Sequence, residues 1–276
     1  MINNIGELTK ILGMTRGELL KLRRDADSYY STRFEPKLDK KGNPKLDKMG
    51  VVLQREINPS HNQLKRIQTR LYRYLSSTRM PEYVHGSIKG KDNISNAKAH
   101  KGKKYKFELD LKDYYPSISI VRVNDTFRLM GFPAYIASYL TRLTTYKGHL
   151  PQGAPTSSVI CNLVFLETDA NISDYCLKND ITYTRYIDDL TFSSHSELRS
   201  HTLSLIQKIV ADGFRINRKK TKLKKGPAVI TGVVTRNNVL DVTKEFKKSI
   251  SRSKNDERAL RGKVNYMRNV KKNNFK

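Results

Sequence analysis

Apolar residues recur with helical spacing in the first part of the chain. The apolar positions in Ile5–Leu12 and Leu19–Leu22 predict two short amphipathic helices separated by Gly13, and Thr15 with Glu18 forms a capping box at the start of the second. Such a pair suits either two helices that pack at a domain edge, which is the more common arrangement, or a DNA-binding helix-turn-helix over residues 5–24.

The next two segments differ in their apolar pattern, since the first has no apolar period and the second has a helical one. Residues 35–50, EPKLDKKGNPKLDKMG, contain two near-copies of PKLDK and no apolar period, which indicates a mobile basic loop or an extended hairpin. From Asn62 to Leu75, apolar residues fall on one helical face. We therefore expect a helix there with a buried side and a basic side.

Strict alternation begins at Tyr105 and predicts a strand. Tyr105, Phe107, Leu109 and Leu111 share one face, and Lys106, Glu108 and Asp110 share the other. Later segments predict a helix from Pro116 to about Gly131, a helix from about 156 to 178, a helix from about 196 to 212 that ends at Gly213, a hairpin of 228–235 with 239–242, and a basic helical tail after Thr243.

Paired carboxylates stand out in ITYTRYIDDLTFSS, residues 181–194. Two β-rich runs flank Asp188 and Asp189, so these acids are expected at the tip of a hairpin. An acidic turn is one interpretation, and a bound divalent cation is the other, because Mg²⁺ prefers hard oxygen ligands. Asp110, at the end of its own strand, is the best third ligand. Three such acids suit two metal ions about 4 Å apart that promote phosphoryl transfer.

Charge and composition limit the kinds of molecule that this chain can bind and the kinds of site that it can form. The chain has 276 residues with Lys+Arg 53 against Asp+Glu 26, a formal net charge of +27, and 37% hydrophobic residues. This surplus favours RNA or DNA as the partner, with an anionic membrane surface as the weaker alternative. Cys161 and Cys176 are too few for a disulfide framework or a four-ligand zinc site. No long apolar segment or signal peptide is recognisable, so we expect a cytoplasmic protein that does not insert into membranes.

Four ordered blocks resemble the palm motifs of reverse transcriptases. They are FELDLKDYYPSI (107–118), LPQGAPTSSVICNLVFLETD (150–169), YIDDLTFS (186–193) and GFRINRKKTK (213–222). The resemblance implies an α+β fold with right-hand polymerase architecture, in which helices back an antiparallel palm sheet. It places fingers at 1–85 and 118–155, palm at 86–117 and 156–242, and a short basic helical thumb at 243–276.

The resemblance also implies roles for individual residues. Asp110, Asp188 and Asp189 match the catalytic, metal-binding triad, with the Leu111 carbonyl as a backbone ligand of two Mg²⁺ ions. Five further residues match nucleotide-binding positions: Arg55, Asp113, Tyr115, Gln152 (beside Gly153) and Lys220. Arg55 would grip the triphosphate, and Tyr115 would exclude a 2′-hydroxyl. Lys220 would act as general acid or as phosphate clamp.

Two shorter elements are similar to those of bacterial retron reverse transcriptases. Asn96, Ala97 and His100 match an NAxxH element, and Ile230, Thr231 and Gly232 resemble a VTG element. The resemblance implies deoxynucleotide substrates, a cognate structured noncoding RNA, an RNA-linked single-stranded DNA product, and a role in antiphage defence with a separate effector protein. Asn96, His100, Thr231 and Gly232 then become candidates for RNA binding, as do Arg258 and Arg261 in the tail.

Other interpretations stay open at this point. A basic chain of this kind also fits three alternatives: a group II intron type enzyme, another defence-associated reverse transcriptase, and an RNA-binding scaffold with secondary catalysis. Only a short segment follows Thr243, so the grip on primer and template would depend partly on the RNA or on a partner. The basic positions of that tail could equally form a solvated charged face.

Overall fold

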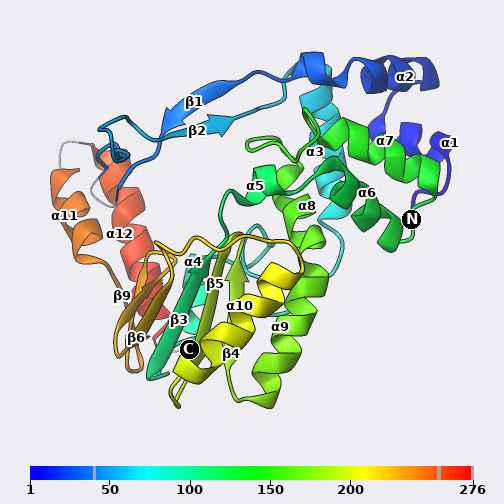
Figure 1. Cartoon of the computed structure of the whole chain (residues 1–276). Helices are drawn as coiled ribbons and strands as arrows, with labels where there is room; N and C mark the ends of the chain where they lie inside the picture. Colours follow the sequence, from blue (N-terminus) through cyan, green and yellow to red (C-terminus); the bar gives the residue numbers. More distant parts are fainter. Residues whose placement is uncertain (40–41, 254–255, 275–276) are drawn as a thin grey trace. The chain divides into compact units, whose positions relative to one another are not determined.

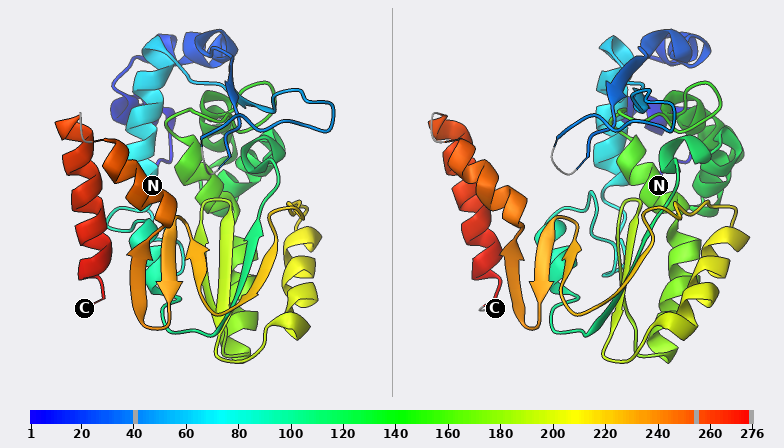
Figure 2. Two further views of the ribbon diagram at one scale, coloured as in Figure 1. Left: turned by 90° about the vertical axis from the view of Figure 1, so that its left-hand side faces the viewer. Right: turned by 60° about the vertical axis from the view of Figure 1, so that its left-hand side comes forward.

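The computed structural model describes residues 1–39, 42–253 and 256–274. The chain divides into two compact units, Met1–Arg79 with Asp113–Leu166 and Met80–Lys112 with Glu167–Lys276. Helices and antiparallel sheets make up both units, which confirms the α+β class (Figures 1 and 2). No helix of the described residues is long and apolar enough to cross a membrane. The division into fingers, palm and thumb remains a prediction.

The first unit begins with the two expected helices. α1 (Ile5–Leu12) ends at Gly13 in the left-handed conformation, and α2 (Arg16–Arg24) carries the complete capping box of Thr15 and Glu18. Their buried leucines pack against α3 (Asn62–Leu75) and α7 (Ala134–Thr144). The pair therefore builds part of the core of this unit, as packing helices do.

The PKLDK repeats form an extended hairpin. β1 (Arg33–Pro36) pairs with β2 (Gln54–Ile57). Beyond this pairing each copy closes a loop of its own, with one isolated bridge between Leu38 and Pro44 and another between Leu46 and Val52. Each copy turns at its aspartate: the Asp39 carboxylate accepts the Asn43 N–H, and the Asp47 carboxylate accepts the N–H groups of Met49 and Val51. The hairpin interpretation is confirmed for the described residues; Lys40 and Lys41 lie outside them.

The helices that follow the strand ending at Asp110 are more broken than their sequence predicts. Instead of one helix from Pro116, there is a short α5 (Tyr114–Ser117) and then α6 (Ile120–Leu129). Ser119 separates them because its side chain accepts the Arg122 N–H and caps α6. The helix expected over 156–178 is likewise divided at Phe165 into α8 (Ser157–Val164) and α9 (Leu166–Lys178).

The second unit contains a four-stranded antiparallel sheet in the order β4-β5-β3-β6. The strands are β3 (Tyr105–Asp110), β4 (Thr182–Tyr186), β5 (Asp189–Ser194) and β6 (Lys222–Lys225). On one face, the rings of Phe107, Phe192 and Tyr183 stack in a row. α9 and α10 (Thr202–Ala211) cover this face (Figure 1). α10 was expected from Ser196; a 3-10 turn (Arg199–His201) precedes it instead.

The polar face of the same sheet is also buried. Lys106 is 2% exposed and its ammonium donates to the carbonyls of Lys103 and Gly226. His100, which follows α4 (Asn93–Lys98), lies between the hydroxyls of Ser193 and Thr184 at 2.7 Å from each. Both faces of the sheet are therefore covered, although the sequence alternates as if one face met solvent.

A three-stranded sheet, β7 (Ala228–Ile230), β8 (Val233–Arg236) and β9 (Val239–Val242), completes the second unit with α11 (Lys244–Arg252) and α12 (Glu257–Lys272). The segment 228–235 was expected as one strand. It turns at Thr231 and Gly232, whose φ angles are +44° and +87°. Ile94, Val233, Leu240 and Val270 share a core here. The helical tail is confirmed for the described residues.

Candidate active site

The register of the palm-like sheet brings two of the expected catalytic acids together. Asp110, the last residue of β3, is the cross-strand partner of Asp189, the first residue of β5. Their side chains share a face because they are direct partners. Asp188 lies in the turn before Asp189, and its carbonyl accepts the Leu111 N–H at 2.9 Å. The three acids thus meet at one end of the sheet, as the sequence predicts.

Two side chains from the loop before β6 engage Asp110. The Lys220 ammonium donates to Asp110 Oδ2 at 2.6 Å, and the Asn217 side-chain amide donates to Oδ1 at 3.0 Å. The Asn217 N–H also donates to the Asp110 carbonyl at 2.8 Å. Asp110 is 5% exposed, so these donors satisfy a nearly buried carboxylate. Asn217 lies within the motif GFRINRKKTK, and its contact with Asp110 was not predicted from the sequence.

Burial and neighbouring negative charge perturb the protonation of Asp189. Burial, followed by the charges of Asp188 and Asp110, raises the pKa of Asp189 to about 7. Burial lowers the pKa of Lys220, but its hydrogen bond to Asp110 and the surrounding acids outweigh that effect and leave the pKa above its usual value. The site therefore combines excess negative charge with one firmly protonated lysine.

This donor set fits a divalent cation in its chemistry. Carboxylates at a strand end and a hairpin turn offer hard oxygen ligands, and a cation would offset both the burial and the neighbouring negative charge that raise the pKa of Asp189. Within residues 1–39, 42–253 and 256–274, no group of three or more His, Cys, Asp or Glu side chains is arranged to hold a metal. Each Asp110 oxygen already accepts one hydrogen bond, so a metal ion at this carboxylate would share it with Lys220 and Asn217.

The first unit contains the other nucleotide-binding candidates. Arg55 lies exposed on β2, opposite Glu35 of β1. The loop that carries Gln152 joins the end of the same strand pair, because the Asn58 N–H donates to the Gln152 carbonyl at 2.7 Å. Gly153 has a φ of +104°, and a Cβ there would lie 2.8 Å from Ile57 Cγ2. A glycine is therefore required at this contact.

Tyr114 and Tyr115 have different surroundings. Tyr114 is 3% exposed, and its hydroxyl donates to the Cys161 carbonyl at 2.6 Å. The sequence-based assignment of Tyr114 to the core is confirmed. Tyr115 is half-buried, and its ring centroid lies 6.0 Å from that of Tyr114. Asp113 is exposed with a φ of +49° and starts α5.

The NAxxH and VTG-like elements meet each other in the second unit. Asn96 is fully buried, and its amide donates to the Thr231 hydroxyl at 3.3 Å. The Thr231 hydroxyl also lies 3.1 Å from the Asn93 carbonyl, while the Asn93 amide donates to the Thr231 carbonyl and to the Tyr266 hydroxyl of α12. His100 is buried in the sheet contact described above, and burial lowers its pKa to about 3. Gly232 remains exposed.

The basic positions of the tail divide between two faces of α12. Arg258, Arg261 and Arg268 are exposed. Lys263 instead donates to the Ser249 carbonyl and the Ser253 hydroxyl of the preceding helix segment. The three arginines therefore offer exposed basic surface to a polyanion, as do Lys271 and Lys272 at the end of the same helix.

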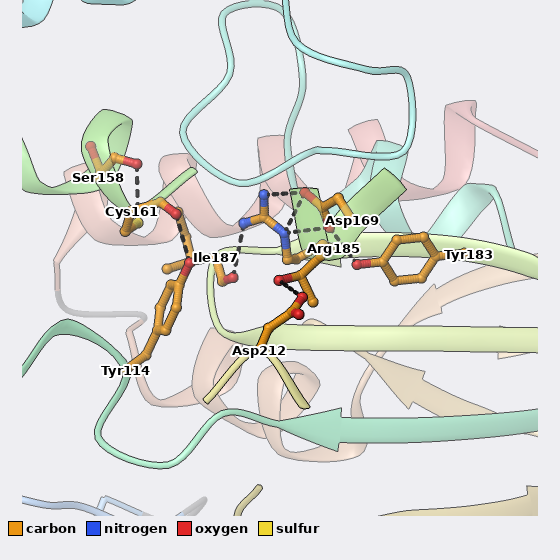
Figure 3. Close-up of polar contacts among 9 residues, drawn as sticks. Tyr114, Ser158, Cys161, Asp169, Tyr183, Arg185, Ile187 and Asp212 are labelled. Carbon is orange, nitrogen blue, oxygen red and sulfur yellow. Dashed lines mark hydrogen bonds and ion pairs between the residues drawn. The ribbon is translucent and has the colours of Figure 1, made fainter. Parts of the chain in front are cut away.

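A buried ion pair lies beneath the turn that carries Asp188 and Asp189, and the sequence did not predict it. Arg185 on β4 and Asp169 on α9 are both 0% exposed at their side chains and lie 2.6 Å apart (Figure 3). Tyr183 donates to the same carboxylate at 2.6 Å. The available signal was positional: Arg185 is two residues after Tyr183, on the apolar face of the strand, where a charged side chain requires a partner.

Comparisons with known proteins agree with these observations. The family described as reverse transcriptase (RNA-dependent DNA polymerase) matches residues 48–247. The retron Ec86 reverse transcriptase of Escherichia coli is 31% identical over 91% of this chain and 77% of that protein. The retron Se72 reverse transcriptase of Salmonella heidelberg is 29% identical over 90% of this chain and 66% of that protein.

Among solved structures, a telomerase from Candida albicans, in complex with a fragment of telomeric RNA, aligns with 66% of this chain. The alignment covers 38% of the telomerase chain, at 13% identity and a TM-score of 0.47.

The family match spans most of the chain and includes the Asp110, Asp188 and Asp189 positions. This chain therefore belongs to the reverse transcriptases, and its relatives place it among those of retrons.

Proposed function

We propose that this chain is an RNA-directed DNA polymerase of the retron type. The observation that carries the proposal is the register of Asp110 against Asp189, with Asp188 in the adjoining turn, in a chain of this family. Carboxylates placed together in this way have little structural use, because like charges opposite each other on a sheet are destabilising. They suit a reaction in which a cation and a phosphate share the site.

Asp110, Asp188 and Asp189, with the Leu111 carbonyl, would hold two Mg²⁺ ions. When bound, such ions supply Lewis acidity for in-line phosphoryl transfer. Among the protein's own groups, Lys220 places a positive charge beside Asp110, where it would contact phosphate oxygens of the nucleotide. Arg55, Asp113, Tyr115 and Gln152 would bind and orient the deoxynucleotide, and Tyr115 would exclude a 2′-hydroxyl by collision.

The nucleic-acid partners follow from charge and from the family. The surplus of +27 suits a structured noncoding RNA and the DNA copied from it, because phosphate contacts dominate such binding. We propose that Arg258, Arg261 and Gly232 contact the RNA directly. Asn96, His100 and Thr231 would support that surface from within, since their side chains face protein partners. The RNA-linked DNA product and an effector protein that acts in antiphage defence belong to the same proposal.

Primer extension tests the polymerase activity. The purified chain, an RNA template with a DNA primer, deoxynucleotides and Mg²⁺ should give extended DNA, and Asp189→Asn should abolish it. Asp180→Asn is the matched control, since it makes the same chemical change at an exposed turn of the same unit. Full extension by Asp189→Asn would reject the assigned site.

Sequencing of the nucleic acid that copurifies with the chain tests the retron type. RNA joined covalently to short single-stranded DNA is the expected result. Intron RNA would support the intron-type alternative, and RNA without DNA in a protein that is inactive in primer extension would support the scaffold.

A further inference from the structure

The ion pair of Arg185 and Asp169 lies directly under the turn that carries the catalytic acids. Arg185 Nε and Nη2 both donate to the Asp169 carboxylate, at 2.9 and 2.6 Å. Placing two charges in a core has a large desolvation cost, and apolar residues of similar size often serve stability as well or better. Stability alone therefore gives a weak reason for this pair to be here.

A third contact from the same guanidinium suggests another reason. Arg185 Nη1 donates to the Ile187 carbonyl at 3.1 Å, as Figure 3 shows. Ile187 is the turn residue immediately before Asp188, and its φ is +58°. The left-handed region is unfavourable for a β-branched residue, because its Cβ crowds the following carbonyl. The turn thus requires outside contacts to keep this conformation.

The backbone of Gly86 closes on Ile187 from another element. The segment 83–86 runs beside β4: the Arg185 N–H donates to the Tyr83 carbonyl and the His85 N–H donates to the Arg185 carbonyl, each at 2.8 Å. This pairing brings Gly86 so close to the turn that a Cβ on it would lie 2.5 Å from Ile187 N. Only glycine fits there without a backbone shift.

The next carbonyl along the turn is fixed as well. The Asp188 carbonyl accepts the Leu111 N–H of the segment that follows β3. Two successive carbonyls are therefore held by different parts of the unit, Ile187 by a side chain and Asp188 by the backbone. The peptide between them has little freedom to rotate, which fixes the direction in which the Asp188 side chain leaves the chain.

We propose that Arg185, Asp169 and Gly86, together called the turn lock, are positioning residues for the metal-binding carboxylates. Asp169 orients the guanidinium, Arg185 and Gly86 hold Ile187 in the left-handed conformation, and Ile187 sets the place of Asp188. The inference rests on the proposed function, because it assigns Asp188 to metal binding. The turn lock itself does not touch substrate.

An apolar replacement of the ion pair separates positioning from stability. Arg185→Met combined with Asp169→Leu and Tyr183→Phe removes the pair and its hydroxyl donor without leaving a buried charge unpaired. In this folded variant the Mg²⁺ concentration for half-maximal primer extension should rise about tenfold. A change of this order is expected when the contact with Arg185 no longer offsets the free-energy cost of the left-handed conformation at Ile187. The KM for deoxynucleotide at saturating Mg²⁺ should stay unchanged. Mn²⁺ binding measured by calorimetry without nucleotide should weaken in parallel.

Two further variants sharpen the result. Tyr183→Phe alone removes one donor to Asp169 but keeps the Arg185–Ile187 contact, so its Mg²⁺ requirement should match that of the unchanged protein. Adding Ile187→Gly to the triple variant should restore much of the Mg²⁺ affinity, because glycine adopts positive φ without steric cost. A purely structural role for the pair predicts no such rescue.

Gly86→Ala provides a test that leaves the ion pair intact. This substitution should also raise the Mg²⁺ requirement, because the added Cβ displaces Ile187. If the triple variant does not fold, Gly86→Ala alone tests whether the turn lock positions the carboxylates. A folded triple variant or a Gly86→Ala variant with unchanged Mg²⁺ dependence and unchanged Mn²⁺ binding would overturn the turn lock. If the turn lock is rejected but Asp189→Asn is inactive in the same assay, the proposed function is retained. Full activity of Asp189→Asn would reject the proposed function itself.

Discussion

Asp110, the last residue of β3, and Asp189, the first residue of β5, are direct cross-strand partners, and the ammonium of Lys220 lies 2.6 Å from the Asp110 carboxylate. Two carboxylates in this relation repel each other. Lys220 offsets part of that repulsion from within the chain. A metal ion that takes Asp110 as a ligand would compete with this lysine.

Replacing Lys220 should therefore strengthen metal binding while it weakens the metal-free fold. Lys220→Met removes the cation from the acids, and we expect a loss of about 1 kcal/mol without metal, since the lysine is half exposed and solvent screens the pair. The rise in melting temperature on adding Mg²⁺ should exceed that of the unchanged protein. Thermal melts with and without Mg²⁺ measure both effects, with the exposed neighbour variant Lys219→Met as control. Equal Mg²⁺-induced shifts in all three proteins would contradict the competition.

Tyr115 should select the sugar of the incoming nucleotide. Tyr115→Ala removes the ring proposed to collide with a 2′-hydroxyl, so the ratio of ribonucleotide to deoxynucleotide incorporation should rise at least about tenfold. Competition between the two substrates in primer extension measures the ratio. Tyr114→Phe is the control: it removes the donor to the Cys161 carbonyl, which should cost about 1 kcal/mol of stability and leave sugar selection unchanged. An unaltered ratio in Tyr115→Ala would remove its proposed role.

Arg55 should act on nucleotide binding rather than on folding. Arg55→Ala should raise the KM for deoxynucleotide at least about tenfold, because a guanidinium binds phosphate with two parallel hydrogen bonds. The melting temperature should change little, since the side chain is exposed. Arg33 lies on the same strand pair and forms an exposed ion pair with Glu35, so Arg33→Ala is the matched control. A KM that rises equally in both variants would indicate a general effect of charge.

Much of the site could be predicted because its residues lie in local sequence patterns. Alternation places Asp110 at a strand end, and the runs around Asp188 and Asp189 predict a hairpin. The opposition of Asp110 and Asp189 depends on strand register, which no local pattern states. The contact between Asn96 and Thr231 joins segments 135 residues apart, and no local pattern predicts it.

The burial of polar residues and the breaks in helices that the sequence did not predict have a common physical cause. His100, Arg185 and Asp169 are polar residues whose burial becomes favourable only when partners from other elements satisfy them. Composition and periodicity treat such residues as surface positions. The broken helices at Ser119 and Phe165 are similar cases, since a cap or a change of packing overrides a continuous helical pattern.

His100 should make the fold sensitive to acid. Burial, then the charges of His85 and Lys106, lowers its pKa from 6.5 to about 3. The folded state therefore excludes a proton that the unfolded state binds below about pH 6.5, and stability falls as pH decreases toward the folded pKa. The slope contributed by this one group approaches about 1.4 kcal/mol per pH unit.

His100→Gln keeps hydrogen-bonding capacity between Ser193 and Thr184 but does not titrate. Between pH 6.5 and 4, the melting temperature of the variant should therefore fall less steeply than that of the unchanged protein. Asp189, whose pKa is raised, contributes a slope of opposite sign to both proteins, and His85, whose pKa burial lowers to about 4, contributes a slope of the same sign to both, so the difference between the two curves reports His100. Parallel curves for the two proteins would show that His100 is protonated equally in the folded and unfolded states.

The exposed arginines of α12 should contribute to RNA affinity through phosphate contacts. Arg258 and Arg261 are exposed near the start of α12, one helical turn apart. Replacing both with alanine should lower RNA affinity and reduce the slope of log affinity against log salt by about 1.5, as expected for two lost phosphate contacts. Filter binding over a range of salt concentrations measures this. Lys178→Ala with Arg199→Ala removes the same charge from exposed positions outside the tail, and its salt slope should match that of the unchanged protein. If both double variants lost the same slope, RNA would be responding to total charge rather than to this face of α12.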